Sequence, residues 1–162
     1  MTQKSMVDNF ISKKNLAVVG VSRNEKKFGS TVYRELKRKN YTVQAVNPSL
    51  DSFDGDPCYP NLGSLPVIAD GAVLVVPPAV TEQIVEDAHK AGIKSIWMQQ
   101  GSESEKAIQF CKNNGIEAVH GECIMKHNKR RKYAQNPRGV KVTFQGTERT
   151  GTFALPGIQI LA

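Results

Sequence analysis

Residues 16–30, LAVVGVSRNEKKFGS, constrain the fold of this chain more than any other segment. A short apolar run ends at Gly20, a polar and basic turn follows, and a helix-like pattern begins after Phe28 and Gly29. A strand that ends at a glycine and continues as a helix directs backbone N–H groups and a positive helix end at one point. The segment therefore predicts a strand, a phosphate-binding loop and a helix in succession.

This loop differs from the fingerprint of dinucleotide-binding proteins. The pattern G-x-G-x-x-G would need glycine at two positions that hold Ser22 and Glu25. The loop carries Arg23, Lys26 and Lys27, which make it more cationic than a usual NAD loop. We therefore expect a ligand with several phosphate charges.

Strands and helices are predicted to alternate along the chain. The apolar runs are nearly continuous, as they are in a parallel sheet that is covered on both faces. We expect strands at residues 16–20, 42–47, 71–76, 95–99 and 116–119, and helices at residues 4–14, 30–39, 81–91 and 102–114. Gly92 and Gly115 would end two helices, and Ser102 with Glu105 would open the last one as a capping box.

The predicted fold class is α/β, with a Rossmann-like parallel five-stranded sheet, helices on both faces, and a single domain plus a C-terminal tail. Right-handed crossovers favour the strand order 3-2-1-4-5 for this sheet. A ligand of such a sheet binds in the crevice at the carboxyl ends of the strands. We place the domain at residues 1–127 and a basic C-terminal extension at residues 128–162.

The net charge of +7 arises largely in a basic run near the start of this extension. The run contains Lys126, Lys129, Arg130, Arg131, Lys132, Arg138 and Lys141. Tyr133 is the one aromatic residue within this run, so we expect the extension to be a solvated arm. We do not expect nucleic acid as a partner, and any that binds would do so only through this tail. Residues 140–144 alternate apolar and polar like an exposed strand, which could dock on a sheet edge or on another subunit.

Several protein classes are excluded by composition. No apolar run approaches the roughly 18 residues that span a bilayer, and the N-terminus lacks the apolar stretch of a secretory signal. We therefore expect a cytoplasmic protein with no membrane partner. Cys58, Cys111 and Cys123 are odd in number and form no C-x-x-C pair, which argues against a disulfide framework and against a metal site.

The other strand ends narrow the choice of ligand. NAD enzymes place an acidic residue at the end of the second strand, where this chain has Val46, Asn47 and Pro48. A neutral strand end beside a cationic loop favours a phosphate on the adenosine ribose, which leaves NADP and coenzyme A as candidates. Pro77 and Pro78 would form a rigid apolar ledge, which suits a pantetheine arm better than a nicotinamide ring.

The sequence resembles the small stand-alone CoA-binding proteins, which are related to the CoA-binding domain of the succinyl-CoA synthetase alpha subunit. The resemblance covers about residues 4–127 and follows six ordered motifs: VVGVSRNEKKFG, YTVQAVNP, CYPNLGSLP, VLVVPP, GIKSIWMQQGSES and GIEAVHGECIM. It implies a Rossmann-like fold that holds coenzyme A in the cleft. The chain departs from the family pattern at Gln100 and at residues 120–122.

The resemblance also implies which residues bind. The phosphate and adenosine end would contact Gly20, Val21, Ser22, Arg23, Phe28, Gly29, Ser30, Val46, Asn47 and Pro48, joined by Lys27 from the cationic loop. The pantetheine arm would lie along Val76, Pro77, Pro78 and Val80 towards Gln99 and Gly101. Because Gly20 would allow backbone and ligand to approach closely, Gly20→Val is expected to abolish binding and to leave the fold largely intact.

The sequence shows no set of nucleophile, base and acid, so we expect no catalytic residues and no metal ligands. The preferred hypothesis is a regulatory or CoA-presenting protein that binds coenzyme A or an acyl-CoA without catalysis of its own. The alternative is an NADP-dependent oxidoreductase that uses the same phosphate loop. Cys123 lies at a strand end near the cleft, where it is either a small buried residue or a thiol that reacts with the ligand.

The first prediction concerns the basic extension. Truncation after His127 is expected to leave the affinity for coenzyme A unchanged and the thermal unfolding temperature nearly so, because exposed like charges repel one another and bury little surface. Calorimetric titration and a thermal melt of both chains check this. A truncated chain that unfolds or changes its oligomeric state would show that the extension is an integral part of the fold.

Overall fold

The computed structural model describes residues 2–24, 26–127, 142–144 and 147–149. The chain divides into two compact units, Met1–Lys129 and Arg130–Ala162. In the second unit, β8 (Val142–Phe144) pairs antiparallel with β9 (Thr147–Arg149), so part of the segment predicted to be an exposed strand is a hairpin strand. The basic run beyond Lys126 lies outside the described residues. Within those residues, no helix is long and apolar enough to cross a membrane.

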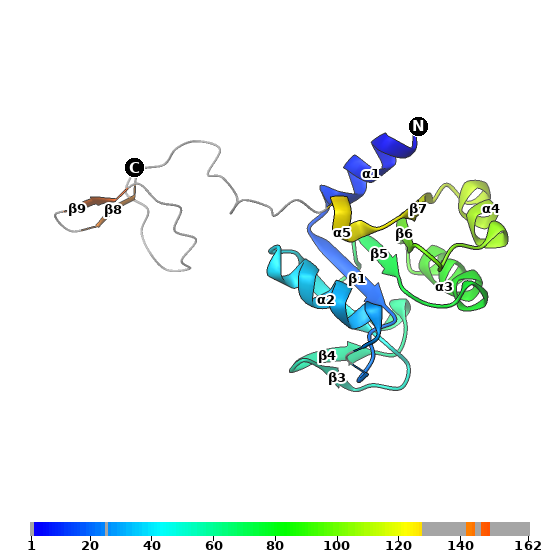
Figure 1. The fold of residues 1–162 in the computed structure, drawn as a ribbon, viewed down its shortest axis with the longest axis horizontal. Helices are drawn as coiled ribbons and strands as arrows, with labels where there is room; N and C mark the ends of the chain where they lie inside the picture. The colour runs from blue at the N-terminus through cyan, green and yellow to red at the C-terminus, as the bar shows by residue number, and fades with distance from the viewer. Residues whose placement is uncertain (1, 25, 128–141, 145–146, 150–162) are drawn as a thin grey trace. The chain divides into compact units, whose positions relative to one another are not determined.

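The first unit is an α/β domain built on a mostly parallel sheet (Figure 1). Its strands are β1 (Asn15–Val19), β2 (Thr42–Val46), β3 (Ser52–Phe53), β4 (Asp56–Tyr59), β5 (Gly71–Leu74), β6 (Ser95–Gln99) and β7 (Glu117–Glu122). Its helices are α1 (Gln3–Ile11), α2 (Phe28–Arg38), α3 (Pro78–Lys90), α4 (Glu105–Asn113), α5 (Ile124–His127) and the 3₁₀ helix η1 (Leu62–Ser64).

The sheet has seven strands in the order β3-β4-β2-β1-β5-β6-β7, so the prediction of five strands is wrong. The two additional strands form a short antiparallel hairpin whose second strand, β4, pairs parallel with β2. The predicted order, which placed the strand at 71–76 beside β2, is also wrong, because β5 pairs with β1. The strands β3 and β4 have only two and four residues, and β4 includes Pro57. Their sequences are therefore too short and too irregular in apolar periodicity to predict strands.

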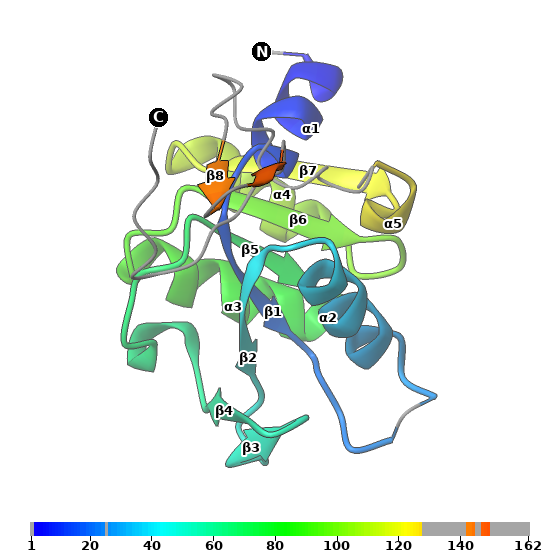
Figure 2. The ribbon, with the colours of Figure 1, turned by 90° about the vertical axis from the view of Figure 1, so that its left-hand side faces the viewer.

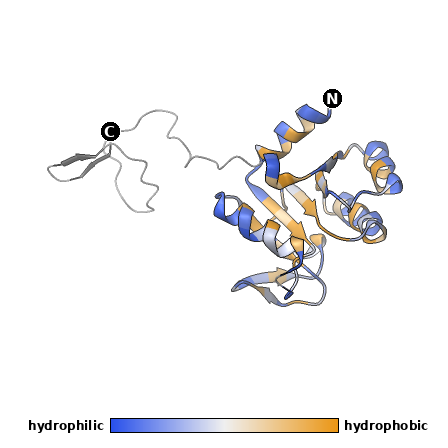
Figure 3. Cartoon of the chain, in the orientation of Figure 1, coloured by the Kyte–Doolittle hydropathy of each residue, from blue (hydrophilic) through white to orange (hydrophobic). Residues whose placement is uncertain are grey.

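Helices cover both faces of the sheet, as the sequence predicted (Figures 1 and 2). Alternate residues of β1 point to opposite faces: Leu16 and Val18 pack with α1 and α2, whereas Ala17 and Val19 pack with α3 and α4. The central strands are coloured mainly as hydrophobic, whereas much of the helices is coloured as hydrophilic (Figure 3). Trp97 is fully buried, and its ring packs edge-on against that of Phe10 in α1.

All four predicted helices begin at residues other than those predicted, and α1 begins at Gln3, one residue earlier. Helix α2 begins at Phe28, two residues earlier, and α3 begins at Pro78, because proline is well accommodated in the first turn of a helix. Helix α4 is capped by Ser104, whose hydroxyl accepts a hydrogen bond from the N–H of Ala107, so the predicted cap at Ser102 is wrong. Gly92 and Gly115 have φ of +80° and +69° and end their helices as predicted.

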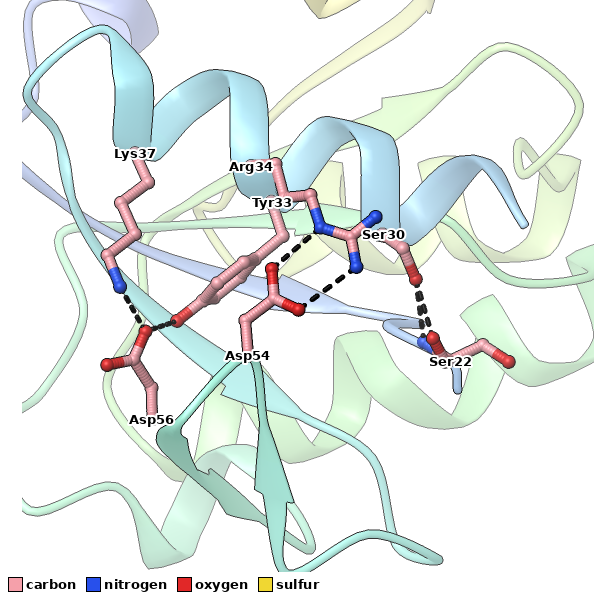
Figure 4. Close-up of polar contacts among 7 residues, drawn as sticks. All are labelled: Ser22, Ser30, Tyr33, Arg34, Lys37, Asp54 and Asp56. Atoms are coloured by element: carbon pink, nitrogen blue, oxygen red, sulfur yellow. Dashed lines mark hydrogen bonds and ion pairs between the residues drawn. The ribbon is translucent and has the colours of Figure 1, made fainter. Parts of the chain in front are cut away.

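The β3–β4 hairpin is attached to α2 by charged and aromatic contacts (Figure 4). Arg34 donates two hydrogen bonds to Asp54, at 2.6 and 3.0 Å, and Asp56 accepts from the Tyr33 hydroxyl at 2.7 Å and from Lys37. The hydrogen bond from Lys37 is the main cause that lowers the pKa of Asp56. These contacts hold the hairpin that follows β2 in a fixed position against the sheet.

We predict that Asp56→Asn lowers the free energy of unfolding by less than about 1 kcal/mol at neutral pH, because the Asp56 side chain is 36% exposed. A carboxylate whose pKa is lower in the folded than in the unfolded protein stabilises the fold at every pH above its unfolded pKa. This stabilisation is lost as the pH falls through the pKa of the folded state. The difference between the wild type and Asp56→Asn should therefore shrink below about pH 4. Denaturant titrations at several pH values measure it, and a difference that grows in acid would contradict the assignment.

Candidate functional site

The candidate site lies at the carboxyl edge of the sheet, where the loops after β1, β2, β5 and β6 meet. The N–H of Gly20 donates to the carbonyl of Val46 at 3.2 Å, and the N–H of Val75 donates to the carbonyl of Val19 at 2.9 Å. The ends of three neighbouring strands are therefore joined through their backbones. This edge is where open α/β sheets bind their ligands.

Gly20 and Gly29 are required by close contacts within the protein. Gly20 has φ of +114°, and a Cβ built there would lie 2.1 Å from the carbonyl oxygen of Val75. A Cβ at Gly29 would lie 2.1 Å from the carbonyl oxygen of Gly20. The first turn of α2, the end of β1 and the end of β5 are thus packed backbone to backbone. The expectation that Gly20 leaves room for the ligand is therefore corrected: the carbonyl of Val75 occupies that space.

Ser30 fixes the loop after β1 by two hydrogen bonds (Figure 4). Its fully buried hydroxyl donates to the carbonyl of Ser22 at 2.7 Å and accepts from the N–H of Ser22 at 3.1 Å. Because the hydroxyl and the Ser22 N–H are bonded to each other, neither is aimed at a ligand. Ser30 lies in the predicted loop region, but its side chain positions the loop.

Asn47 makes a second clamp on the same loop. Its Nδ2 donates to the carbonyl of Val21 at 2.6 Å, and its Oδ1 accepts from the N–H of Ser49 at 2.7 Å. The side chain thus joins the end of β2 to the loop after β1, whereas the sequence predicts Asn47 only as a neutral strand end that contacts the ligand. A neutral amide can make both bonds at once, whereas a carboxylate has no donor for the Val21 carbonyl.

The start of α2 presents the donors and charges expected of an anion site. Lys27 is the N-cap residue and makes no side-chain capping hydrogen bond. Arg23, Lys26 and Lys27 are exposed on the loop, and Phe28 has 44% of its surface exposed. The loop is held in shape by Asn24, which accepts from the N–H groups of Lys26 and Lys27 at 3.0 and 2.9 Å. This arrangement places a helix N-terminus and three cationic side chains in one short segment.

The segment after β5 turns into a helix within three residues. Pro77 is the N-cap of α3 and Pro78 its first residue, so the two prolines start a helix and do not extend as a ledge. Val80, in the first turn, has 41% of its surface exposed. The N–H of Val76 donates to the Ser102 hydroxyl at 3.1 Å, and Ser102 is buried. Ser102 was therefore missed as a positioning residue, because its pattern with Glu105 was read as a helix cap.

At the end of β6, Gln99 is buried and bonded within the protein, whereas Gly101 is exposed. Gln99 is 1% exposed, its Nε2 donates to the Cys123 sulfur at 3.0 Å, and its Oε1 accepts from the N–H of Ile124 at 3.1 Å. The Gln99 side chain thus joins β6 to the turn after β7. Gly101 is exposed with φ of +93°, and its N–H donates to a carboxylate oxygen of Glu103 at 2.9 Å.

The histidines and cysteines named here do not form a catalytic or metal-binding cluster. His127 is hydrogen bonded to Glu122 at 2.7 Å, and His89 is exposed on α3. Burial raises the pKa of the Cys111 thiol to about 11, and Cys123 is half-buried. In the described part of the chain, no group of three or more His, Cys, Asp or Glu could hold a metal ion.

A pocket of about 250 Å³ lies away from the carboxyl edge, over the first half of β2. Its lining comes from the C-terminal half of α2, β2 and β4: Lys37, Tyr41, Thr42, Val43, Gln44, Asp56, Pro57 and Tyr59. Lys37 and Asp56 are bonded to each other there, so their charges offset. The pocket shares no residue with the predicted site.

Comparison with known proteins identifies the family. Residues 14–129 match the family described as the CoA binding domain, and the chain belongs to that family. Among curated relatives, an ADP-forming acetate–CoA ligase of Methanocaldococcus jannaschii is 33% identical over 119 residues, which cover 68% of this chain and 17% of the relative. A second such ligase, from Archaeoglobus fulgidus, is 29% identical over 121 residues, 68% of this chain and 18% of the relative. The chain thus spans less than a fifth of these two enzymes.

Solved structures of similar size share the fold. A conserved hypothetical protein of Pyrococcus furiosus is 38% identical with a TM-score of 0.69, over 71% of this chain and 99% of that one. A hypothetical protein of Pyrococcus horikoshii OT3 is 28% identical with a TM-score of 0.73, over 78% of this chain and 89% of that one. The domain therefore also exists as a chain of its own in these proteins.

The close packing at Gly20 predicts a large effect of a single methyl group. Gly20→Ala should lower the free energy of unfolding by several kcal/mol, because a Cβ would overlap a backbone oxygen. Gly92→Ala is the matched control: its φ is +80°, nothing lies within 4 Å of its Cβ, and it should cost only about 1 kcal/mol. Chemical denaturation measures both, and equal costs would contradict the packing argument.

Proposed function

We propose that this protein binds coenzyme A or an acyl-CoA at the carboxyl edge of its sheet, and that it serves as a regulatory or CoA-presenting protein without catalysis of its own. The observation that carries the proposal is the start of α2, where an N-terminus without a side-chain cap lies beside Arg23, Lys26 and Lys27. Membership of the CoA-binding domain family supports the choice of ligand.

The ligand's phosphates would be bound by the loop after β1 and the first turn of α2. The backbone contacts among Gly20, Gly29 and Val75 and the clamps from Ser30 and Asn47 hold this loop in place before any ligand arrives. A preorganised site loses less conformational entropy on binding than a loop that must first be ordered. Helix-end N–H groups and exposed cations then supply charge-assisted hydrogen bonds to the phosphates.

The absence of catalysis is proposed from the state of the nearby polar side chains. The hydroxyls of Ser30 and Ser102 are bonded to backbone groups, and His127 is bonded to Glu122. Among the described residues of this edge, these bonds join no nucleophile to a base. The related ligases are more than five times as long as the matched segment, so their activity is not transferred to this chain.

An NADP-dependent oxidoreductase would use the same loop and must be distinguished by experiment. Both ligands carry a phosphate on the adenosine ribose, so the loop alone does not separate them. Titrations with coenzyme A, NADP and ATP under identical conditions separate the two functions. Coenzyme A is expected to bind most tightly, and tighter binding of NADP would overturn the proposal.

The cationic loop predicts that coenzyme A binds at least about tenfold more tightly than dephospho-CoA, because a charge-assisted contact contributes roughly 1.5 to 3 kcal/mol. Calorimetry measures both affinities. Replacement of Lys27 by Gln should narrow the difference, whereas Lys94→Gln, an exposed lysine between α3 and β6, should leave it unchanged. Equal affinities for the two ligands in the wild type would contradict the role given to these side chains.

A further inference from the structure

Two glutamates are held at the β6 end of the carboxyl edge. The carboxylate of Glu103 accepts from the N–H of Gly101 at 2.9 Å, directly after β6. The carboxylate of Glu82, near the start of α3, accepts from the Ser104 hydroxyl at 2.6 Å. Both residues are half-buried. Their charges are therefore fixed at the loops where β5 and β6 end, and neither is a freely moving surface side chain.

The charges of the edge are separated along the strand order. The cations Arg23, Lys26 and Lys27 follow β1, whereas Glu103 follows β6, two strands away. At the spacing of neighbouring strands, β1 and β6 are roughly 10 Å apart. In the described part of the chain, no ion pair joins Glu82 or Glu103 to a base. One end of the edge is thus cationic and the other anionic.

The basic side chains on the helices next to the anionic end are either hydrogen bonded or exposed to solvent. His127 on α5 is bonded to Glu122 of β7, and Lys106 on α4 and Lys126 on α5 are exposed. An exposed ammonium group is strongly hydrated and screened by salt. The half-buried carboxylates of Glu82 and Glu103 are screened less than such ammonium groups.

The direction of a bound ligand follows from the same residues. Phosphates are attracted to the cationic loop, and an uncharged arm prefers the apolar surface of Val76, Pro77 and Val80 between β1 and β6. An arm that follows this surface ends at the loop of Gly101, beside the two carboxylates. The group attached to the end of the arm therefore meets negative charge.

We propose that the site accepts coenzyme A and thioesters of neutral acyl groups, and that Glu82 and Glu103 disfavour acyl groups that carry a carboxylate. The inference rests on the proposed function and names the ligand class of the same site. Its physical basis is like-charge repulsion, which separates ligands that share every other contact. A single methyl or ethyl group at the thioester adds no charge and is tolerated at the exposed Gly101 loop.

The test is a set of calorimetric titrations on the full chain with coenzyme A, acetyl-CoA, propionyl-CoA, malonyl-CoA and succinyl-CoA. The neutral thioesters should bind within about threefold of coenzyme A, and the two carboxylated ones about tenfold more weakly at low salt. The difference should shrink as salt is raised, because the ions screen the repulsion. Propionyl-CoA controls for the acyl chain, since it is succinyl-CoA with a hydrogen in place of the carboxylate.

Two isosteric variants test whether Glu82 and Glu103 cause the weaker binding of the carboxylated thioesters. Glu82→Gln and Glu103→Gln keep an oxygen that accepts from Ser104 and from Gly101, so the loops should keep their shape. The double variant should bind succinyl-CoA nearly as well as acetyl-CoA, whereas Glu86→Gln, an exposed residue one turn further along α3, should behave like the wild type.

The outcomes separate the two claims. If coenzyme A itself does not bind, the proposed function is wrong. If coenzyme A binds and succinyl-CoA binds as tightly as acetyl-CoA, the function stands and the charge discrimination is wrong. A discrimination that persists unchanged in the double variant would overturn the assignment to Glu82 and Glu103.

Discussion

The contact of three backbone segments at Gly29, Gly20 and Val75 determines the arrangement of the candidate site. Each glycine faces a carbonyl oxygen that would lie 2.1 Å from a Cβ, so Gly29 approaches Gly20, and Gly20 approaches Val75, more closely than any other residue type allows. This approach brings the N-terminus of α2 to the carboxyl edge of the sheet. Ser30 and Asn47 then fix the loop in between, by hydrogen bonds to Ser22 and Val21.

Polar side chains near this edge serve mainly to hold the loops together. Ser30, Asn47, Ser102 and Gln99 each bond to groups of another loop or strand end, and they link the ends of β1, β2, β5, β6 and β7. Buried polar groups are costly unless they are hydrogen bonded, so such a network favours one arrangement of the loops. The groups left for a ligand are the start of α2, the exposed cations and the apolar surface at Val80.

The charge distribution supports the proposal that a long ligand binds at this edge in a single direction. Arg23, Lys26 and Lys27 lie at one end and the fixed carboxylates of Glu82 and Glu103 at the other. Family membership agrees with a ligand that has a highly charged nucleotide end and an uncharged arm. The β3–β4 hairpin, attached to α2 through Tyr33, Arg34 and Lys37, extends the sheet beyond β2 and covers the edge of that strand.

The sequence alone determined the fold class, the central strands and the position of the loop between β1 and α2, because apolar periodicity and the glycine after β1 are local signals. Tertiary structure decided the strand order, the β3–β4 hairpin and the roles of individual site residues. The strand at 71–76 pairs with β1 because β4 takes the place beside β2, and a pairing partner is a long-range property. Gly20, Ser30, Asn47 and Gln99 lie where the sequence placed them, yet their contacts are with the protein itself, since which group a side chain meets depends on packing between segments far apart in the chain.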